Sequence, residues 1–94
     1  MSVAVILTSI RPSKETPFFV CPEALFNEYS ANVNFVKEEV TYPDDFTEVK
    51  TIVWNSTAAA KNFKTMSVVH FINIELNAHN LEHNITTTEE TKEL

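Results

Sequence analysis

The segment Ser2–Ile10 carries apolar side chains at both alternating sets of positions, which constrains the fold more than any other stretch of the chain. Successive side chains of a β-strand point to opposite faces of the sheet. The two sets are Val3, Val5 and Leu7 on one face and Ala4, Ile6 and Ile10 on the other. A strand that is apolar on both faces must be covered on both sides. One layer of helices in a chain of 94 residues covers only one face, so we expect a second copy of the protein to cover the other.

Composition places the chain among ordinary globular proteins with one domain over residues 1–94, since 44% of the residues are hydrophobic and 21% are charged. The net charge of −6 argues against a nucleic-acid partner, because phosphate binding needs clustered Lys and Arg. Cys21 is the only cysteine, which suits a reducing compartment, and no apolar run is long enough for a membrane helix. We therefore expect a soluble, cytoplasmic protein. The absence of glycine excludes glycine-rich phosphate loops and assigns positive φ angles to Asn or Asp.

The remaining elements can be read in chain order from their periodicity and turn residues. The sequence predicts a helix over Pro22–Asn32 with the apolar stripe Leu25, Phe26, Tyr29 and Val33. Strands are predicted over Asn34–Tyr42 and Glu48–Asn55, joined by a turn at Pro43–Asp45. An N-cap at Ser56 or Thr57 then begins a helical run to about Asn84, with a restart or kink at Ser67. The adjacent apolar residues Phe35 and Val36 indicate a bulge. The threonine-rich tail is expected to form a strand over its first half. This order predicts an α+β fold, the ferredoxin-like split βαβ arrangement with an antiparallel sheet.

The long helical run carries two apolar stripes and one polar series. One stripe contains Phe71, Ile74, Ala78, Leu81 and Ile85, and the other contains Val68, Ile72 and Leu76. The polar series consists of His70, Asn73, Asn77, Asn80 and Asn84, spaced by three and four residues. It indicates either a solvated face or the polar wall of a cavity.

Two features near residue 20 allow a structural and a functional interpretation. Phe18 and Phe19 end an irregular segment with two prolines, and they form either a flap over a cavity or an anchor of this loop on the core. Cys21 directly precedes a helix, whose N-terminus can lower a thiol pKa and create a nucleophile. The alternative is a structural cysteine, since no histidine that would act as its base lies nearby in the sequence.

Glu75, His79 and His83 lie on one face of the long helix, at a spacing that can bind a divalent metal. The residue after His79 is Asn80 and not the glutamate of a catalytic zinc helix. A histidine near a helix C-terminus also interacts favourably with the helix dipole, which explains the pair without a metal. We therefore expect no metal and no haem to be required for folding.

The segment Val53-Trp54-Asn55-Ser56, followed by alanines, Phe63 and a long apolar helix, resembles the third strand and second helix of the antibiotic-biosynthesis-monooxygenase-like family. The resemblance covers about residues 47–85. It implies a dimeric α+β barrel, a homodimer whose sheets face each other, in agreement with the apolar faces of the first strand. Haem-degrading members of the wider superfamily carry an Asn on the first strand and a Trp and a His on the second helix. Phe63 and Asn73 stand at the latter two positions here and the first strand has no Asn, so we do not expect haem degradation.

The resemblance implies a cofactor-independent oxygenase-like enzyme that acts on a small apolar or aromatic substrate. Such an enzyme needs an apolar cavity and a few polar groups that stabilise a substrate anion. The candidates are His70, Tyr29 and Asn73 as catalytic residues and Trp54, Phe18 and Phe19 as ligand-binding residues, with no cofactor and no metal. The alternative is a non-catalytic dimeric module that binds a small ligand or a protein partner. A cavity with convergent polar groups favours the enzyme, and a filled core favours the module.

Overall fold

The computed structural model describes residues 1–94 and contains one four-stranded sheet and three helices. The elements in chain order are β1 (Val3–Ile10), α1 (Glu23–Ser30), β2 (Phe35–Asp44), β3 (Thr47–Trp54), α2 (Thr57–Thr65), α3 (Ser67–His83) and β4 (Thr86–Glu93). The strand order is β2-β3-β1-β4, and every neighbouring pair is antiparallel. The predicted α+β, ferredoxin-like arrangement is therefore confirmed. None of the helices has the length and apolar content that a membrane crossing requires.

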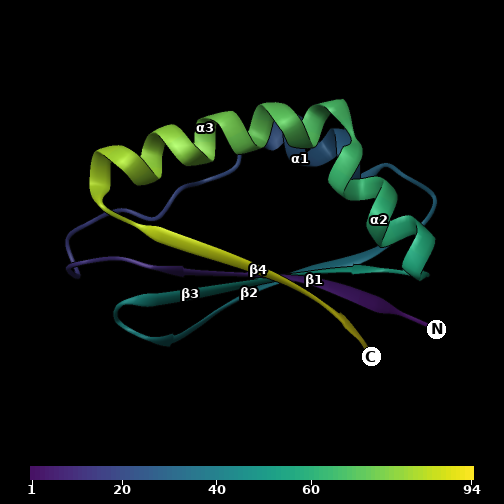
Figure 1. Ribbon diagram of the computed structural model, residues 1–94, viewed down its shortest axis with the longest axis horizontal. Helices are drawn as coiled ribbons and strands as arrows, with labels where there is room; N and C mark the ends of the chain where they lie inside the picture. Colours follow the sequence, from purple (N-terminus) through teal and green to yellow (C-terminus); the bar gives the residue numbers. More distant parts are fainter.

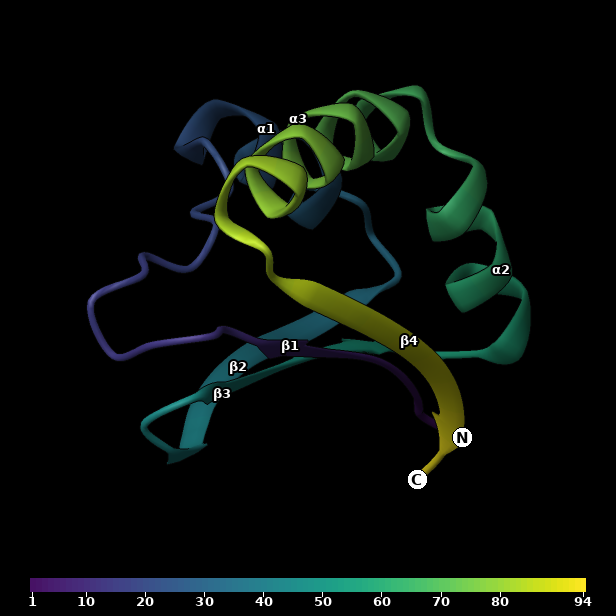
Figure 2. The ribbon, with the colours of Figure 1, turned by 60° about the vertical axis from the view of Figure 1, so that its left-hand side comes forward.

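All three helices lie on one side of the sheet, and the other side is uncovered (Figure 1). α1 and α3 run side by side above the sheet, whereas α2 covers one end of it (Figure 2). Val3 and Val5 of β1 are buried in the core beneath the helices. The strand alternation therefore turns the neighbouring Ile6 toward the uncovered face. The two-faced pattern of the first strand thus corresponds to one covered and one uncovered face.

Trp54 at the end of β3 lies at the centre of the core. Its residue surface is 0% exposed, and its ring centroid lies 5.7 Å from that of Phe35 and 5.0 Å from that of Phe63. The ring of Tyr29 reaches the same cluster, at 5.2 Å from Phe63. These aromatic pairs join β2, β3, α1 and α2 around the buried Trp54 ring. The predicted bulge is confirmed, because the register between β2 and β3 shifts between Phe35 and Lys37.

The helical run after β3 is capped and interrupted as the sequence predicts. The Ser56 hydroxyl accepts a hydrogen bond from the Ala59 amide at 3.1 Å, which makes Ser56 the N-cap of α2. Met66 has an extended backbone with ψ at 139°, and α3 begins at Ser67. The last residue of the run, Asn84, is the only residue with a positive φ angle, at 57°. An asparagine therefore ends this helix in the left-handed conformation in a chain without glycine.

Three predicted boundaries are wrong. β2 continues through Pro43 to Asp44 instead of ending at Tyr42, because Asp44 still pairs with Thr47 of β3. α1 ends at Ser30 instead of Asn32. The chain turns at Asn32, whose side-chain oxygen accepts a hydrogen bond from the Asn34 backbone amide. Val33, assigned to the apolar stripe of this helix, is consequently 91% exposed. β4 continues to Glu93, well past the first half of the tail, because it pairs with β1 along its full length. Backbone hydrogen bonds to a central strand stabilise it although most of its side chains are exposed.

The structure buries only one of the two apolar stripes of α3. Of the two apolar stripes, Val68 and Ile72 pack toward the core, whereas Phe71, Ile74 and Leu81 are exposed. Both stripes have helical periodicity, so periodicity alone cannot select the buried one. The selected orientation turns Asn73 and Asn80 of the polar series toward the sheet side.

Candidate functional site

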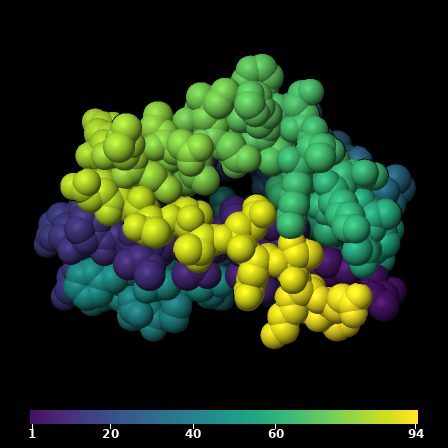
Figure 3. Space-filling model, in the orientation of Figure 1, coloured from purple at the N-terminus to yellow at the C-terminus, as the bar shows by residue number.

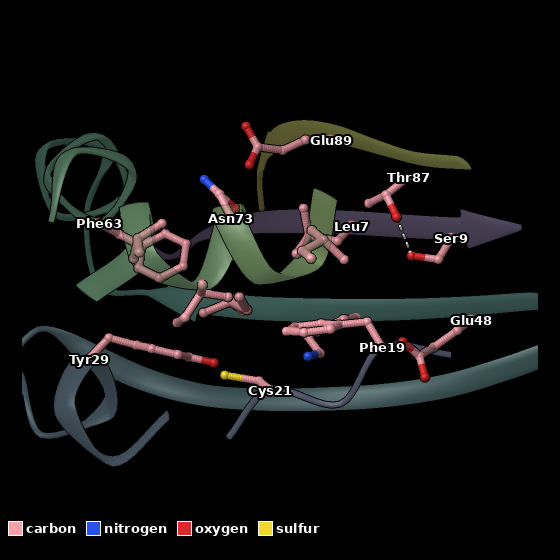
Figure 4. Close-up of a pocket in the computed structure, with 15 residues that line it drawn as sticks. Leu7, Ser9, Phe19, Cys21, Tyr29, Glu48, Phe63, Asn73, Thr87 and Glu89 are labelled. Atoms are coloured by element: carbon pink, nitrogen blue, oxygen red, sulfur yellow. Dashed lines mark hydrogen bonds between the residues drawn. The ribbon is translucent and has the colours of Figure 1, made fainter. Parts of the chain in front are cut away.

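A cavity of ≈ 60 Å³ lies between α3 and the sheet. Its apolar wall consists mainly of Leu7, Phe19, Ile52, Phe63, Val69, Ile72 and Leu76. Figure 4 places Phe63 and Tyr29 toward one end of the cavity and Phe19 and Glu48 toward the other. The surface is hollowed between α3 and β4, where the cavity reaches the outside (Figure 3). At about 10–15 Å³ per water molecule, the cavity has room for roughly four or five waters, or one ring-sized group.

The loop between β1 and α1 closes part of this cavity because several contacts fix it. Arg11 donates from Nε to the Asp45 carbonyl at 2.8 Å, and its guanidinium lies 4.5 Å from the centre of the Phe18 ring. On the other side of the loop, the His79 Nε2–H donates to the Pro17 carbonyl at 2.8 Å. Phe19 lines the cavity. The two phenylalanines therefore differ, since Phe18 anchors the loop and Phe19 forms part of the cavity wall.

Tyr29 of α1 is the most buried polar group of the cavity, at 3% exposed. Its hydroxyl donates a hydrogen bond to a carboxylate oxygen of Glu38 on β2. Burial raises the pKa of the phenol far above its ordinary value, and the hydrogen bond to Glu38 and the charge of that residue raise it further. The hydroxyl is therefore protonated at any physiological pH. It can orient a ligand, but it is not a general base.

Cys21 lines the cavity next to Tyr29, and Figure 4 shows its sulfur and the Tyr29 hydroxyl pointing toward each other. Burial raises the pKa of this thiol above its ordinary value. Lys50 and a backbone hydrogen bond from Phe26 oppose that shift, whereas Glu38 and Glu75 add to it. Since the net direction is upward, the group is a neutral thiol near pH 7. This favours the structural interpretation of Cys21 over the nucleophilic one.

Most of the charged and hydroxyl groups around the cavity have a partner within the protein. Glu48 accepts from the Tyr42 hydroxyl at 3.0 Å, and Glu89 lies 3.7 Å from the Lys64 ammonium. Ser9 and Thr87 form a hydrogen bond to each other at 2.8 Å, drawn as a dashed line in Figure 4. The Lys50 side chain makes no ion pair and no hydrogen bond with the protein. It is the cationic residue of the cavity lining, and its charge has no direct partner.

The structure brings together three of the six candidate site residues. Tyr29, Phe19 and Asn73 line the cavity. His70 is exposed and borders a separate surface hollow at the junction of α2 and α3, and the Trp54 ring belongs to the closed core. Phe18 packs against Tyr42 with ring centroids 6.1 Å apart. His70, Trp54 and Phe18 are therefore not part of the cavity lining, and their positions give no support to the predicted roles in catalysis or ligand binding.

Lys50 and Cys21 are the chemically useful cavity residues that sequence reasoning did not select. Lys50 alternates with Ile52 and Trp54 on β3, so a charged residue on the inward face of a strand was the available signal. For Cys21 the signal was its place directly before a helix, which does not indicate that it lines a cavity. It reaches the cavity through the path of the loop from residue 11 to residue 22, which has no periodicity to read.

We expect excess chelator to leave the melting temperature of this protein unchanged. The rings of His79 and His83 lie with centroids 4.4 Å apart, but the His79 Nε2 contacts the Pro17 carbonyl. No group of three His, Cys, Asp or Glu side chains is arranged to hold a metal ion. The test is a thermal melt with and without EDTA, together with elemental analysis of untagged protein. Stoichiometric zinc and a fall of many degrees with EDTA would contradict this prediction.

Comparison with known proteins gives matches at the level of structure only. No family model matches the sequence, and no curated protein matches it. A variant of SnoaB, a cofactor-independent oxygenase from Streptomyces nogalater, superposes with a TM-score of 0.68 at 15% identity, covering 99% of this chain and 92% of that one. A candidate antibiotic biosynthesis monooxygenase from Deinococcus radiodurans gives a TM-score of 0.62 at 11% identity, over 97% and 91% of the two chains.

A third structure, Rv0793 from Mycobacterium tuberculosis, gives a TM-score of 0.59 at 13% identity and covers 100% of this chain and 96% of that one. All three similarities extend over nearly the whole chain. They go well beyond residues 47–85, which carry the resemblance in the sequence. At these identities they establish the fold and not the reaction. The chain has the fold of the antibiotic-biosynthesis-monooxygenase-like proteins.

Proposed function

We propose that this protein is a cofactor-independent oxygenase-like enzyme that acts on a small apolar or aromatic substrate. The observation that carries the proposal is the apolar cavity between α3 and the sheet, bordered by a few polar groups. The cavity is built on a fold shared with a cofactor-independent oxygenase over 99% of this chain. A cavity of this kind is the default location of a ligand site.

The proposed reaction uses a substrate that supplies its own electrons. An activated methylene loses one proton to solvent and becomes a carbanion, whose electrons then reduce molecular oxygen. One oxygen atom stays on the carbon as a ketone, and the other leaves as water with the two hydrogens of the methylene. The conversion of CH₂ and O₂ to C=O and H₂O is balanced without another reductant.

The residues of the cavity have limited roles in this reaction. Ile52, Phe63 and Ile72 bind the apolar ring and exclude water. Asn73 at the cavity mouth has an amide that makes no hydrogen bond within the protein and is available to an anionic oxygen of the substrate. Tyr29 keeps its proton, so it holds one end of the cavity and takes no proton from the substrate.

The test is oxygen uptake with single-ring compounds that carry a readily ionised methylene, such as cyclohexane-1,3-dione and phenylacetaldehyde. We expect the parent protein to oxidise at least one of them and to transfer one atom of ¹⁸O₂ to the product. Asn73→Leu should lower kcat/KM at least about tenfold, because a donor to the developing anion is lost. Asn77→Leu is the matched control, since Asn77 is an exposed residue of the same helix outside the cavity lining.

The alternative is a non-catalytic dimeric module that binds a small ligand or a protein partner. It is favoured by the raised pKa values of Tyr29 and Cys21, which leave the buried end of the cavity without a base near pH 7. Ligand binding without oxygen uptake over the whole substrate panel would support this alternative and contradict the oxygenase.

We also propose that the protein is a homodimer joined through the uncovered face of the sheet. The helices cover only the opposite face, and Ile6, Val49 and Thr51 alternate toward the uncovered one. A cytoplasmic location is part of the same proposal, because a chain with one cysteine gains no internal disulfide from an oxidising compartment.

A further inference from the structure

We propose that Lys50 is the anion anchor of the cavity and that the substrate is a single aromatic ring that carries one anionic group, such as a carboxylate, beside its activated methylene. This inference rests on the proposed function and names the class of its substrate. Lys50 becomes a specificity-determining residue in this interpretation. The ring enters the apolar part of the cavity, and the charged oxygen faces the Lys50 ammonium.

The strand register directs Lys50 toward the cavity. It pairs with Leu7 on β1 and with Val40 on β2, and it follows the same alternation as Ile52, which is 2% exposed beneath the helices. Lys50 and Leu7 both line the cavity. A lysine in the middle of a central strand has neighbours on both sides, so the cavity is the direction in which its side chain has space.

The distribution of hydrogen-bond partners indicates the sign of the ligand. Glu38 and Glu48 each accept a hydrogen bond, from Tyr29 and Tyr42 respectively, and Glu89 forms an ion pair with Lys64 at 3.7 Å. The groups left without a partner are the Lys50 ammonium and the Asn73 amide, and both offer N–H donors. Free donors beside occupied acceptors match a ligand that accepts hydrogen bonds. An ionised oxygen makes the stronger of such bonds.

The surrounding carboxylates limit the ligand to one negative charge. Glu48 and Glu89 line the same cavity as Lys50, and Glu38 lies behind Tyr29. A second anionic group would face these carboxylates without a cation to balance it, and such like-charge contacts select against the wrong ligand. The cavity volume of ≈ 60 Å³ limits the buried part of the ligand to no more than one ring. An aromatic monoanion therefore fits both the charge and the space.

Three probes of equal size test the inference by binding alone, namely benzoate, benzamide and benzylammonium. Titration followed by ¹H–¹⁵N NMR shifts of the cavity residues gives each dissociation constant. We expect the parent protein to bind benzoate about tenfold more tightly than benzamide, and benzylammonium least, because a charge-assisted hydrogen bond exceeds a neutral one. Added salt should weaken benzoate binding and leave benzamide binding nearly unchanged.

Lys50→Met should remove the preference for benzoate, and Lys50→Arg should retain most of it. Lys61→Met is the matched control, because it makes the same charge change at an exposed residue of α2 outside the cavity lining. The salt dependence of the parent protein provides a result that does not depend on the folding of any variant. Three results would overturn the inference: an unchanged preference in Lys50→Met, tighter binding of benzylammonium than of benzoate, or no binding of any probe.

These results are separable from those of the oxygen-uptake test. A preference for benzoate without oxygen uptake on any substrate would retain the anion anchor and reject the oxygenase. Oxygen uptake that is equal in the parent protein and in Lys50→Met would retain the oxygenase and reject the role of Lys50.

Discussion

Trp54→Ala should lower the free energy of unfolding by about 3–5 kcal/mol, the range typical of a buried tryptophan replaced by alanine. The Trp54 ring is enclosed completely and packs against Phe35 and Phe63, so its removal separates β2 from α2. For a domain of this size, that loss corresponds to a melting temperature lower by about 12 °C or more. Thermal and urea unfolding followed by circular dichroism measure both quantities.

Trp54→Phe is the matched control for this prediction. The indole Nε1 is buried and has no hydrogen-bond partner, so losing its N–H group removes no hydrogen bond from the folded state. The phenylalanine ring keeps part of the aromatic packing, and we expect it to cost less than half of what the alanine variant costs. A melting temperature of Trp54→Ala within about two degrees of the parent would contradict the structural role of the ring.

The sheet could be predicted from the sequence because its side chains alternate with a clear period of two. The apolar residues of the first strand fall into two alternating sets, one for each face of the sheet. The bulge at Val36 and the N-cap at Ser56 could be predicted as well, because each depends only on residues next to it in the sequence. The extent of β4 was different. Its length depends on pairing with β1, which is far away in the sequence and invisible in the composition of the tail.

The site could be predicted only in part, for a related reason. Tyr29 and Asn73 were found because each belongs to a helix with recognisable stripes. Contacts with the sheet select which apolar stripe of α3 is buried, so the exposure of Phe71 and its neighbours could not be predicted from periodicity. Phe19 and Cys21 belong to the loop before α1 and Lys50 belongs to β3, so no pattern within one segment could predict that the three converge.

Ile6→Glu should convert a homodimer into monomers. Ile6 lies on the central strand of the uncovered sheet face, opposite Thr51 of β3 and Glu90 of β4. In a dimer joined through this face, the new carboxylate would be buried without a partner and would lie close to the negative charge of Glu90. Burying an unpaired charge costs several kcal/mol, so we expect the dimer dissociation constant to rise at least about 100-fold.

Sedimentation at micromolar concentration distinguishes the outcomes, because the parent protein should have twice the 10.7 kDa mass of the chain and Ile6→Glu should have that mass itself. Ile74→Glu makes the same change at an exposed apolar residue on the outer side of α3, and it should leave the dimer intact. If Ile74→Glu dissociates the dimer and Ile6→Glu does not, the copies associate through the helices. If the parent protein sediments as a monomer, the uncovered face of the sheet is not covered by a second copy, and the proposal of a dimeric barrel fails.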